Sequence, residues 1–251
     1  MNNFIDISIS ELKDVNYKYL LSIVIPIYNE SENISNVLDN WDKELKKINI
    51  DYCFIIVNDG SNDNSLEIIK ALNYNIILIN KHNSGHGRTI RIGYEYAVKY
   101  IKSEYILQID GDGQCDPKYL KSFWQNRLDY DFILGVRTIR GDGILRKIIS
   151  KISKFITSFI SSIDLKDPNT PYRLFKLNAL KESLNLVNES FDIHNIALTY
   201  VILKNKYKYK TIKIEFPNRI GGNSSINFIK IFQMGLNLVF ELYFLRKRLK
   251  L

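Results

Sequence analysis

The chain has 251 residues, of which 45% are hydrophobic and 25% are charged. This composition excludes a disordered chain, a collagen-like repeat and a small disulfide-stapled domain, and the length suits one large α/β domain with or without a small appendage. Lysine and arginine number 35 against 27 aspartates and glutamates, which gives a net charge of +8. A basic excess of this size favours phosphate-bearing partners, namely nucleotides, nucleic acid or an anionic membrane surface, without choosing among them.

Cysteine usage and the first residues bear on the compartment. Cys53 and Cys115 lie far apart and form no CxxC pair, which is typical of a reducing environment. The first 20 residues include Asp6, Glu11 and Asp14, and they lack the basic start and apolar run of a signal peptide. We therefore expect a cytoplasmic location.

Short apolar runs alternate with longer amphipathic stretches along the first half of the chain. The predicted strands are 22–27, 52–57, 76–79, 105–109 and 132–136. The predicted helices are 31–47, 64–72, 88–102 and 117–128. Ile- and Val-rich strands separated by helices indicate βαβ units and a mostly parallel sheet flanked by helices. We expect Ser31 to cap the first helix, Pro117 to begin the fourth, and the alternating segment 207–216 to add a later strand.

Ligands bind outside the carboxyl ends of the strands in sheets of this kind. Each of the five predicted strands ends in polar, charged or glycine-rich residues. These ends are YNE (28–30), NDGSNDNS (58–65), NKHNSGHGRT (80–89), DGDGQCDP (110–117) and GVRTIRGDG (135–143). Their clustering predicts a functional site at one edge of the sheet.

The DGD turn after the fourth strand places two carboxylates, Asp110 and Asp112, around Gly111. Two like charges so close repel each other unless a cation or protons compensate them. Carboxylate oxygens suit Mg²⁺ or Mn²⁺, and Gln114 offers a further neutral oxygen. An ordinary Asp/Gly turn is the alternative interpretation.

Two other strand ends offer ligand contacts. Asp59 follows an apolar strand, where its carboxylate can accept hydrogen bonds from a base or a ribose, although a DG dipeptide is also a common turn. The SGHG loop lets its backbone approach a ligand at Gly85, and His86 is a candidate contact to a phosphate or sugar or else an ordinary loop residue. No GxGxxG follows the first strand and no GxxxxGK[ST] occurs, which argues against a dinucleotide-binding dehydrogenase and a P-loop NTPase.

Several arginines in the second half lie near turns or strand ends. Arginine forks suit phosphate oxygens, although surface arginines are common. The candidates are Arg137, Arg140, Arg146, Arg173 and Arg219, with Arg140 favoured least.

With these residues the chain resembles glycosyltransferase family 2, whose members have the GT-A fold. The matching stretches are SIVIPIYNE (22–30), VNDGSNDNS (57–65), NSGHGRTIRIGYEYA (83–97), DGDGQCDP (110–117), GVR (135–137), DPNTPYRLFK (167–176) and NRIGGNSS (218–225). Within the family the sequence is most similar to the branch of dolichyl-phosphate mannosyltransferase-like, polyprenyl-phosphate glycosyltransferases. The chain departs from that branch at Pro171, where a glycine is usual, at Ser225, where a lysine is common, and at His86.

The resemblance implies a role for individual residues. It implies that a nucleotide-sugar donor is held by Pro26, Tyr28, Glu30, Asp59, Gly85, His86, Asp110, Gly111 and Asp112. It implies that Asp110, Asp112 and Gln114 bind Mg²⁺ or Mn²⁺ against the donor diphosphate. It implies that the donor and acceptor phosphates are surrounded by Arg137, Arg146, Arg173, Arg219 and Ser224.

The family chemistry is a single displacement at the anomeric carbon, which inverts its configuration. We expect Asp112, Arg173 and Asp192 to be the catalytic residues. A hydroxyl acceptor needs a general base, for which Asp192 and His194 are the candidates, whereas a phosphate acceptor is already ionised. Several arginines and few bases favour a lipid phosphate over the hydroxyl of a polysaccharide or glycolipid; both Asp192 and His194 also have ordinary interpretations as capping or packed residues.

Two segments favour a membrane surface. Residues 143–163 form a cationic amphipathic pattern, for which packing on the domain itself is the alternative. We expect a transferase domain over 1–225 and an amphipathic basic helix over 226–251 that ends in RKRLKL and does not span the bilayer. We therefore expect a protein peripheral to the cytoplasmic face of a membrane.

Two other classes fit less well. A nucleotidyltransferase on a similar sheet would need a glycine-rich basic loop after the first strand, where this chain has IYNE. A non-enzymatic module that binds nucleic acid or membranes would suit the charge of +8, but it would not need the two carboxylates of the DGD turn. We expect no nucleic-acid partner.

Overall fold

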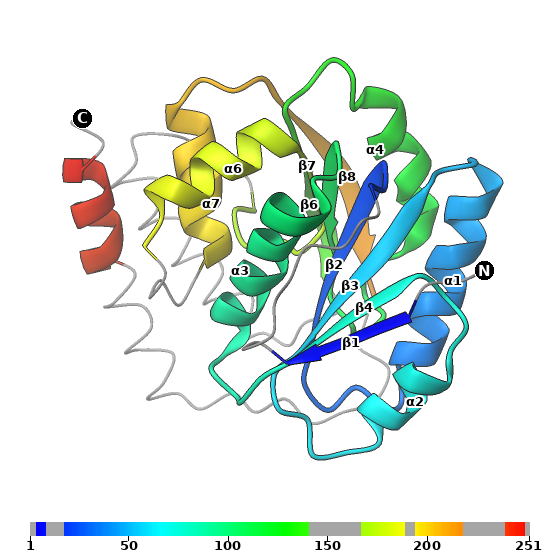
Figure 1. The fold of residues 1–251 in the computed structure, drawn as a ribbon. Helices are drawn as coiled ribbons and strands as arrows, with labels where there is room; N and C mark the ends of the chain where they lie inside the picture. Colours follow the sequence, from blue (N-terminus) through cyan, green and yellow to red (C-terminus); the bar gives the residue numbers. More distant parts are fainter. Residues whose placement is uncertain (1–3, 9–17, 141–166, 189–193, 218–238, 249–251) are drawn as a thin grey trace.

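The computed structural model describes residues 4–8, 18–140, 167–188, 194–217 and 239–248. Its centre is an eight-stranded sheet in the order β1-β4-β3-β2-β5-β7-β6-β8 (Figure 1). The strands are β1 (Phe4–Ser8), β2 (Leu21–Ile27), β3 (Tyr52–Asn58), β4 (Ile76–Asn80), β5 (Tyr105–Gln108), β6 (Phe132–Arg140), β7 (Arg173–Lys176) and β8 (Tyr209–Phe216). All neighbouring strands are parallel except that β7 runs antiparallel to β5 and β6. The predicted mostly parallel α/β sheet is confirmed.

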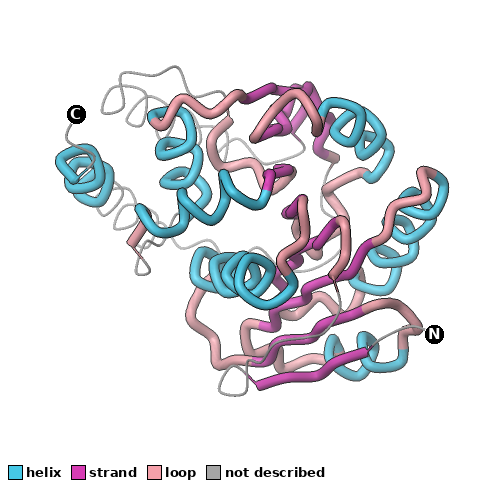
Figure 2. The backbone as a smooth tube through the Cα atoms, turned by 45° about the horizontal axis from the view of Figure 1, so that its top comes forward, coloured by secondary structure: helices cyan, strands magenta, loops and turns pink. Residues whose placement is uncertain are grey.

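Helices cover both faces of the sheet (Figure 2). One face packs against α1 (Ile34–Lys47), α2 (Ser65–Ala71), the 3₁₀ turn η3 (Pro117–Tyr119) and α4 (Leu120–Asn126). The other packs against α3 (His86–Tyr96), the π-helical turn η2 (Ala97–Ile101), α6 (Leu177–Leu186) and α7 (His194–Lys204). A further helical segment, 239–248, contributes Leu242 and Leu245 to this second core. Burial of apolar side chains on both faces explains why the strand sequences are almost continuously hydrophobic.

The strand directions bring the site together. Strands β2, β3, β4 and β5 are parallel, and β6 runs the same way because β7 is antiparallel to both β5 and β6. Their carboxyl ends therefore meet at one edge, where the amino end of β7 also lies. Segment 167–172, which precedes β7, is thus placed beside the residues that follow β5 and β6.

The predicted helix starts can be compared with the structure, and two of them need correction. Ser31 does not cap α1: the helix begins at Ile34 after Asn33, which makes no side-chain capping bond, and the Ser31 N–H donates to Asp63 Oδ2 at 3.0 Å. The predicted helix 88–102 begins at His86 and ends in a π-helical turn. Pro117 does occupy the first turn of its helix, although that turn is 3₁₀.

The C-terminal helical segment is amphipathic over its described residues. Leu242 and Leu245 are buried, whereas Phe240, Tyr243 and Phe244 are 62%, 59% and 64% exposed. Residues 246–248, which are Arg, Lys and Arg, are exposed beside these rings. Within the part of the chain that the structure describes, no helix combines the length and apolar character needed to cross a membrane.

Candidate active site

The loop after β2 is joined to the loop after β3 by hydrogen bonds. The Asn29 N–H donates to Ser61 Oγ at 3.0 Å, and the Glu30 N–H donates to Ser65 Oγ at 2.9 Å. Asn29 adopts a left-handed backbone with φ of 55°, which this polar residue tolerates. The preceding ring, Tyr28, remains 45% exposed at the edge of the sheet. Tyr28 is therefore held in a fixed loop with its ring accessible.

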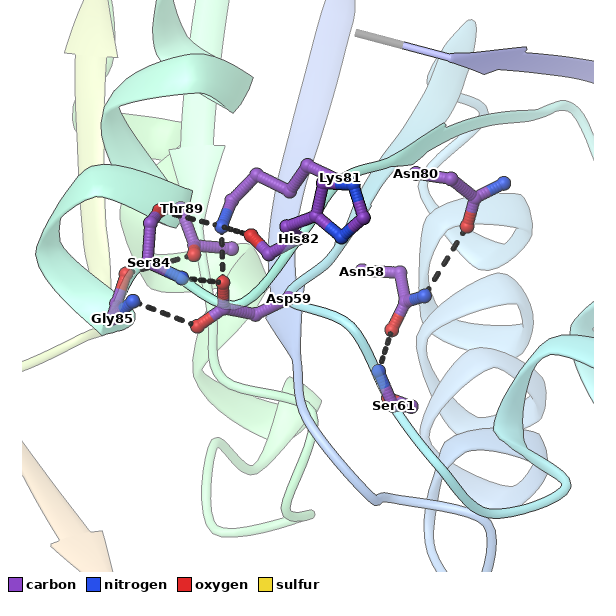
Figure 3. A network of polar contacts seen from close by, with 9 residues as sticks. All are labelled: Asn58, Asp59, Ser61, Asn80, Lys81, His82, Ser84, Gly85 and Thr89. Atoms are coloured by element: carbon purple, nitrogen blue, oxygen red, sulfur yellow. Dashed lines mark hydrogen bonds and ion pairs between the residues drawn. The ribbon is translucent and has the colours of Figure 1, made fainter.

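The Asp59 carboxylate lies at the centre of a buried network (Figure 3). Its Oδ1 accepts hydrogen bonds from the Lys81 ammonium and from the Ser84 N–H at 2.8 Å, and its Oδ2 accepts from the Gly85 N–H at 3.1 Å. The Lys81 ammonium also donates to the carbonyl of His82 at 3.0 Å and to Ser84 Oγ at 2.7 Å. Asp59 thus ties the end of β3 to the loop that follows β4.

The same loop begins helix α3. Gly85 precedes the helix with φ of 93°, a conformation that side-chain-bearing residues rarely adopt, and its carbonyl accepts from the Thr89 N–H at 3.1 Å and the Thr89 hydroxyl at 2.8 Å. His86 is the first helical residue, and its side chain is more than half exposed. His86 Nε2 lies 3.7 Å from Asp110 Oδ1, so the structure brings these two predicted site residues together.

The DGD turn directly follows β5. Gly111 lies so close to β2 that a Cβ atom there would be 2.9 Å from Ile27 Cγ2 and 3.4 Å from the carbonyl oxygen of Pro26. Asp112 Oδ1 accepts from the Gln114 N–H at 3.1 Å, and the Gln114 amide donates to the carbonyl of Pro217 at 2.6 Å. The Gln114 side chain therefore points its nitrogen away, toward the residue that follows β8.

Asp110 carries the clearest sign of a ligand. Its Oδ1 atom is buried and makes no hydrogen bond among the described residues. A buried carboxylate oxygen without a donor is costly, and a bound cation would compensate it. No group of three His, Cys, Asp or Glu side chains suited to a metal occurs in the described ranges. Two carboxylates fit Mg²⁺ or Mn²⁺ when substrate phosphates and water complete the coordination.

Arg137 is engaged within the protein. Its guanidinium donates twice to Asp167, from Nε to Oδ2 and from Nη2 to Oδ1, both at 2.7 Å, and its N–H donates to Oδ2 at 3.0 Å. This paired geometry is among the strongest that an arginine forms. The pair fixes the turn that begins at Asp167, whose φ is 48°, against β6. The sequence predicted Arg137 as a phosphate ligand, but the two guanidinium bonds to Asp167 are those of a positioning residue.

Arg173 is completely buried rather than exposed to a substrate. Its guanidinium donates to the carbonyls of Thr170 at 2.9 Å, Asn195 at 3.0 Å and Pro168 at 2.8 Å. Burial lowers the pKa of Arg173 to about 10. Arg173 joins the 168–170 turn to the start of α7, an arrangement that differs from the predicted contact with phosphate.

His194, one of the two candidate bases, is also buried, with 1% of its surface exposed. Neither ring nitrogen has a hydrogen-bond partner in the described part of the chain. Its ring centroid lies 6.3 Å from that of Tyr94. Burial, followed by the positive charge of Arg91, lowers the pKa of His194 to about 3, so its imidazole is neutral and weakly basic.

Some predicted residues cannot be placed. Arg146, Asp192, Arg219 and Ser224 lie outside the described residues, as do the segment 143–163 and most of 226–251.

Two further predicted donor contacts lie in or after β2. Glu30 is buried, and its carboxylate accepts a hydrogen bond from the Asn33 side-chain amide at 3.0 Å. Pro26 lies in β2, beyond the part of that strand that pairs with β5.

Sequence reasoning missed Lys81 and Asp167. Lys81 directly follows β4, and this position at a strand end was the available signal. Asp167 begins the DPNTPYR stretch, in which the sequence analysis singled out Pro171 and Arg173. Their partners are 22 and 30 residues away, so no local pattern reveals the pairing.

The sequence model of "Glycosyl transferase family 2" matches residues 22–230. The chain belongs to this family. The match spans all five strand ends described above and extends past β8, so the recognition made from the motifs is confirmed.

Two relatives agree with this assignment. CsbB of Bacillus subtilis (strain 168) is 29% identical over 224 residues, covering 87% of this chain and 65% of CsbB. The undecaprenyl-phosphate 4-deoxy-4-formamido-L-arabinose transferase of Proteus mirabilis (strain HI4320) is 26% identical over 230 residues, covering 88% of this chain and 66% of the relative. The chain thus spans slightly less than two thirds of the length of both.

Glucosyl-3-phosphoglycerate synthase from Mycobacterium tuberculosis, solved with Mn²⁺, UDP-glucose and phosphoglyceric acid, superposes with a TM-score of 0.59 at 12% identity. The superposition covers 93% of this chain and 80% of that one. At this identity the likeness establishes the fold, which is the GT-A fold that the motifs predicted.

Proposed function

We propose that this family 2 glycosyltransferase moves a sugar from a UDP- or GDP-linked donor to a polyprenyl phosphate, with inversion at the anomeric carbon, in the synthesis of a cell-surface glycan. The observation that carries the proposal is the buried Oδ1 of Asp110, which makes no hydrogen bond among the described residues and lies 3.7 Å from His86 Nε2 at the start of α3. This places a carboxylate oxygen without a hydrogen bond from the described residues next to a helix N-terminus, where a cation and a diphosphate can bind together.

The donor is proposed to lie along the edge formed by β2, β3 and β5. Tyr28 and Asp59 would contact the base, and Gly85 and His86 the phosphates or sugar. Asp110, Asp112 and the Gln114 amide oxygen would hold Mg²⁺ or Mn²⁺, which supplies positive charge to the leaving diphosphate when bound. The complex of the Mycobacterium tuberculosis enzyme with Mn²⁺ and UDP-glucose supports this arrangement by fold analogy.

A phosphate acceptor is favoured because the chain offers few general bases. His194 is buried, and its pKa of about 3 leaves it too weak to remove a proton from a hydroxyl. Asp192 would then be the remaining base for the alternative, a sugar-hydroxyl acceptor. The Proteus mirabilis relative, an undecaprenyl-phosphate 4-deoxy-4-formamido-L-arabinose transferase, supports a lipid phosphate. Arg146, Arg219 and Ser224 are the proposed contacts to it.

The C-terminal helical segment is proposed to lie on the cytoplasmic face of an anionic membrane. Its exposed Phe240, Tyr243 and Phe244 can enter the interface, and the cations at 246–248 suit acidic headgroups. This would bring the site to a membrane-bound acceptor. The positive charge then serves lipid binding, and no nucleic acid is required as a partner.

The test is transfer from UDP- and GDP-sugars to undecaprenyl phosphate or to an oligosaccharide, with Mn²⁺ or Mg²⁺ and with EDTA. We expect metal-dependent transfer to the lipid phosphate, and a loss of at least about 100-fold in Asp110→Asn, since the electrostatic groups of an active site contribute on this scale. Asp129→Asn, which changes an exposed carboxylate, is the matched control. Transfer only to the oligosaccharide, abolished by Asp192→Asn, would establish the hydroxyl alternative.

A further inference from the structure

We infer that the N-terminal strand β1 sets how tightly the site binds its donor nucleotide, and that Asp6 in this strand is a positioning residue for the loops that hold the nucleotide. The inference rests on the proposed function and extends it. Strand β1 precedes residues 22–230, which match the family, so the family similarity does not account for this strand.

Strand β1 ends at the same edge of the sheet as the site (Figure 1). It is the outermost of the described strands on the side of β4, and it pairs with β4 in parallel, so that Ser8 lies beside Asn80. Ile7 is only 2% exposed, which fixes the strand against the core. The side chain of Asp6 therefore lies within reach of Asn80, the last residue of β4.

A chain of hydrogen bonds leads from Asp6 into the site. The side-chain nitrogen of Asn80 donates to Asp6 Oδ1 at 2.6 Å, and its side-chain oxygen accepts from the Asn58 amide at 3.2 Å. The Asn58 side-chain oxygen in turn accepts from the Ser61 N–H at 3.0 Å, as Figure 3 shows. Ser61 Oγ then accepts from the Asn29 N–H at 3.0 Å. These bonds connect β1 to the loop that follows β2.

The carboxylate of Asp6 determines which way both amides point. An ionised carboxylate only accepts hydrogen bonds, whereas a side-chain amide donates from its nitrogen and accepts at its oxygen. Asp6 therefore turns the nitrogen of Asn80 toward β1 and its oxygen toward Asn58. That oxygen holds the nitrogen of Asn58, which leaves the Asn58 oxygen for Ser61. Without Asp6 the Asn80 amide can turn over, and its nitrogen would then face the nitrogen of Asn58.

The oriented amides border the proposed contacts to the nucleotide. The bond between Asn58 and Ser61 closes the turn that contains Asp59. The bond from Asn29 holds the residue that follows Tyr28. A loop that must first be ordered by the ligand lowers the affinity for that ligand. Loss of the carboxylate in β1 is therefore expected to weaken nucleotide binding and to leave the rate of transfer unchanged once the donor is bound.

The second oxygen of Asp6 makes a contact that can be removed separately. Asp6 Oδ2 lies 2.8 Å from the ammonium of Lys70 in α2, and the two side chains are 34% and 49% exposed. Lys70→Met removes this ion pair but leaves Oδ1 and the amides in place. Asp6→Ala removes both contacts. The difference between the two variants therefore measures the contribution of the chain of amides.

The test is binding of UDP and of GDP to the whole chain with Mn²⁺, measured by calorimetry, together with kcat and the KM for the donor. In Asp6→Ala we expect the nucleotide dissociation constant and the donor KM to rise at least about fivefold, the worth of one hydrogen bond, with kcat unchanged within about twofold. Lys70→Met should keep the wild-type values. Wild-type binding by Asp6→Ala, or an equal loss in Lys70→Met, would overturn the inference and leave the proposed transferase intact. Failure of the wild type to bind either nucleotide would refute the proposed function, and the inference with it.

An exchange of two side chains gives an independent test. Asn80→Asp places two carboxylates against each other and should weaken nucleotide binding at least as much as Asp6→Ala. Adding Asp6→Asn to this variant restores a donor and an acceptor between the two strands, and the carboxylate at position 80 can still accept from Asn58. The double variant should therefore bind within about threefold of the wild type. No recovery in a folded double variant would overturn the inference, and should Asp6→Ala not fold, this exchange decides it alone.

Discussion

Replacing Arg173 with methionine separates two roles for this arginine. The family resemblance places Arg173 among phosphate ligands, whereas the structure buries it completely against three backbone carbonyls. Methionine keeps most of the side-chain volume and removes all the donors. A structural role therefore predicts a large loss of folding stability, and a phosphate-binding role predicts a loss of activity alone.

The magnitude follows from the acceptors that would lose their donor. The carbonyls of Pro168 and Asn195 also accept from the Thr199 hydroxyl, at 3.2 and 2.8 Å, but that hydroxyl has one proton and can serve only one of them. Among the described residues, the Thr170 carbonyl has no such substitute. One or two buried carbonyls would be left unsatisfied, at about 1–3 kcal/mol each, so we expect a loss of about 1–6 kcal/mol in the free energy of unfolding.

Urea unfolding followed by tryptophan fluorescence measures this loss, because Trp41 and Trp124 belong to the folded domain. Arg88→Met, at an exposed position of α3, is the control and should change stability by no more than about 0.5 kcal/mol. A folded Arg173→Met variant with unchanged stability but abolished transfer would refute the structural role. It would show instead that the guanidinium meets a phosphate during the reaction.

Three further predictions concern other positions. Burial in the folded chain lowers the pKa of His194 to about 3, so only the unfolded chain binds a proton there as the pH falls below about 6.5. Between pH 7 and pH 5 the free energy of unfolding, measured with urea, should therefore fall by about 2 kcal/mol more in the wild type than in His194→Leu. Equal losses would contradict a buried neutral imidazole. Gly111→Ala places a Cβ 2.9 Å from Ile27 and should weaken Mn²⁺ binding by calorimetry at least about tenfold with both carboxylates intact; unchanged affinity would show that the turn can shift freely. Replacing Phe240 and Phe244 by serine should reduce sedimentation with anionic vesicles at least about fivefold, and unchanged sedimentation would remove these rings from the membrane contact.

The sheet could be predicted where strands are long, buried on both faces and rich in Ile and Val. Strand β7 escaped prediction because it has four residues, begins with a buried arginine and runs antiparallel. Strand β1 escaped for a different reason. It is a five-residue edge strand in the polar N-terminal stretch, and its pairing with β4 spans about 70 residues of chain.

The candidate site was predictable to the level of which strand ends carry it. The approach of His86 to Asp110 follows from the parallel directions of β4 and β5, which the βαβ pattern already implies. The hydrogen-bond partner of each charged side chain was not predictable. Residue type marks Arg137 and Arg173 as suitable for phosphate, but their partners come from segments that only the folded topology brings beside them.

These internal contacts change how the site should be interpreted. Lys81, Asp167 and Arg173 each fix a loop that borders the edge of the sheet, so the geometry of the site depends on charged residues that need not touch a substrate. The buried pair of Lys81 and Asp59 also limits which hydrogen bonds a ligand can make there. Substitution of such a residue is therefore expected to alter selectivity or folding. A loss of activity alone would not distinguish it from a residue that contacts the reacting atoms, so a measurement of folding stability or of ligand selectivity is needed beside the activity.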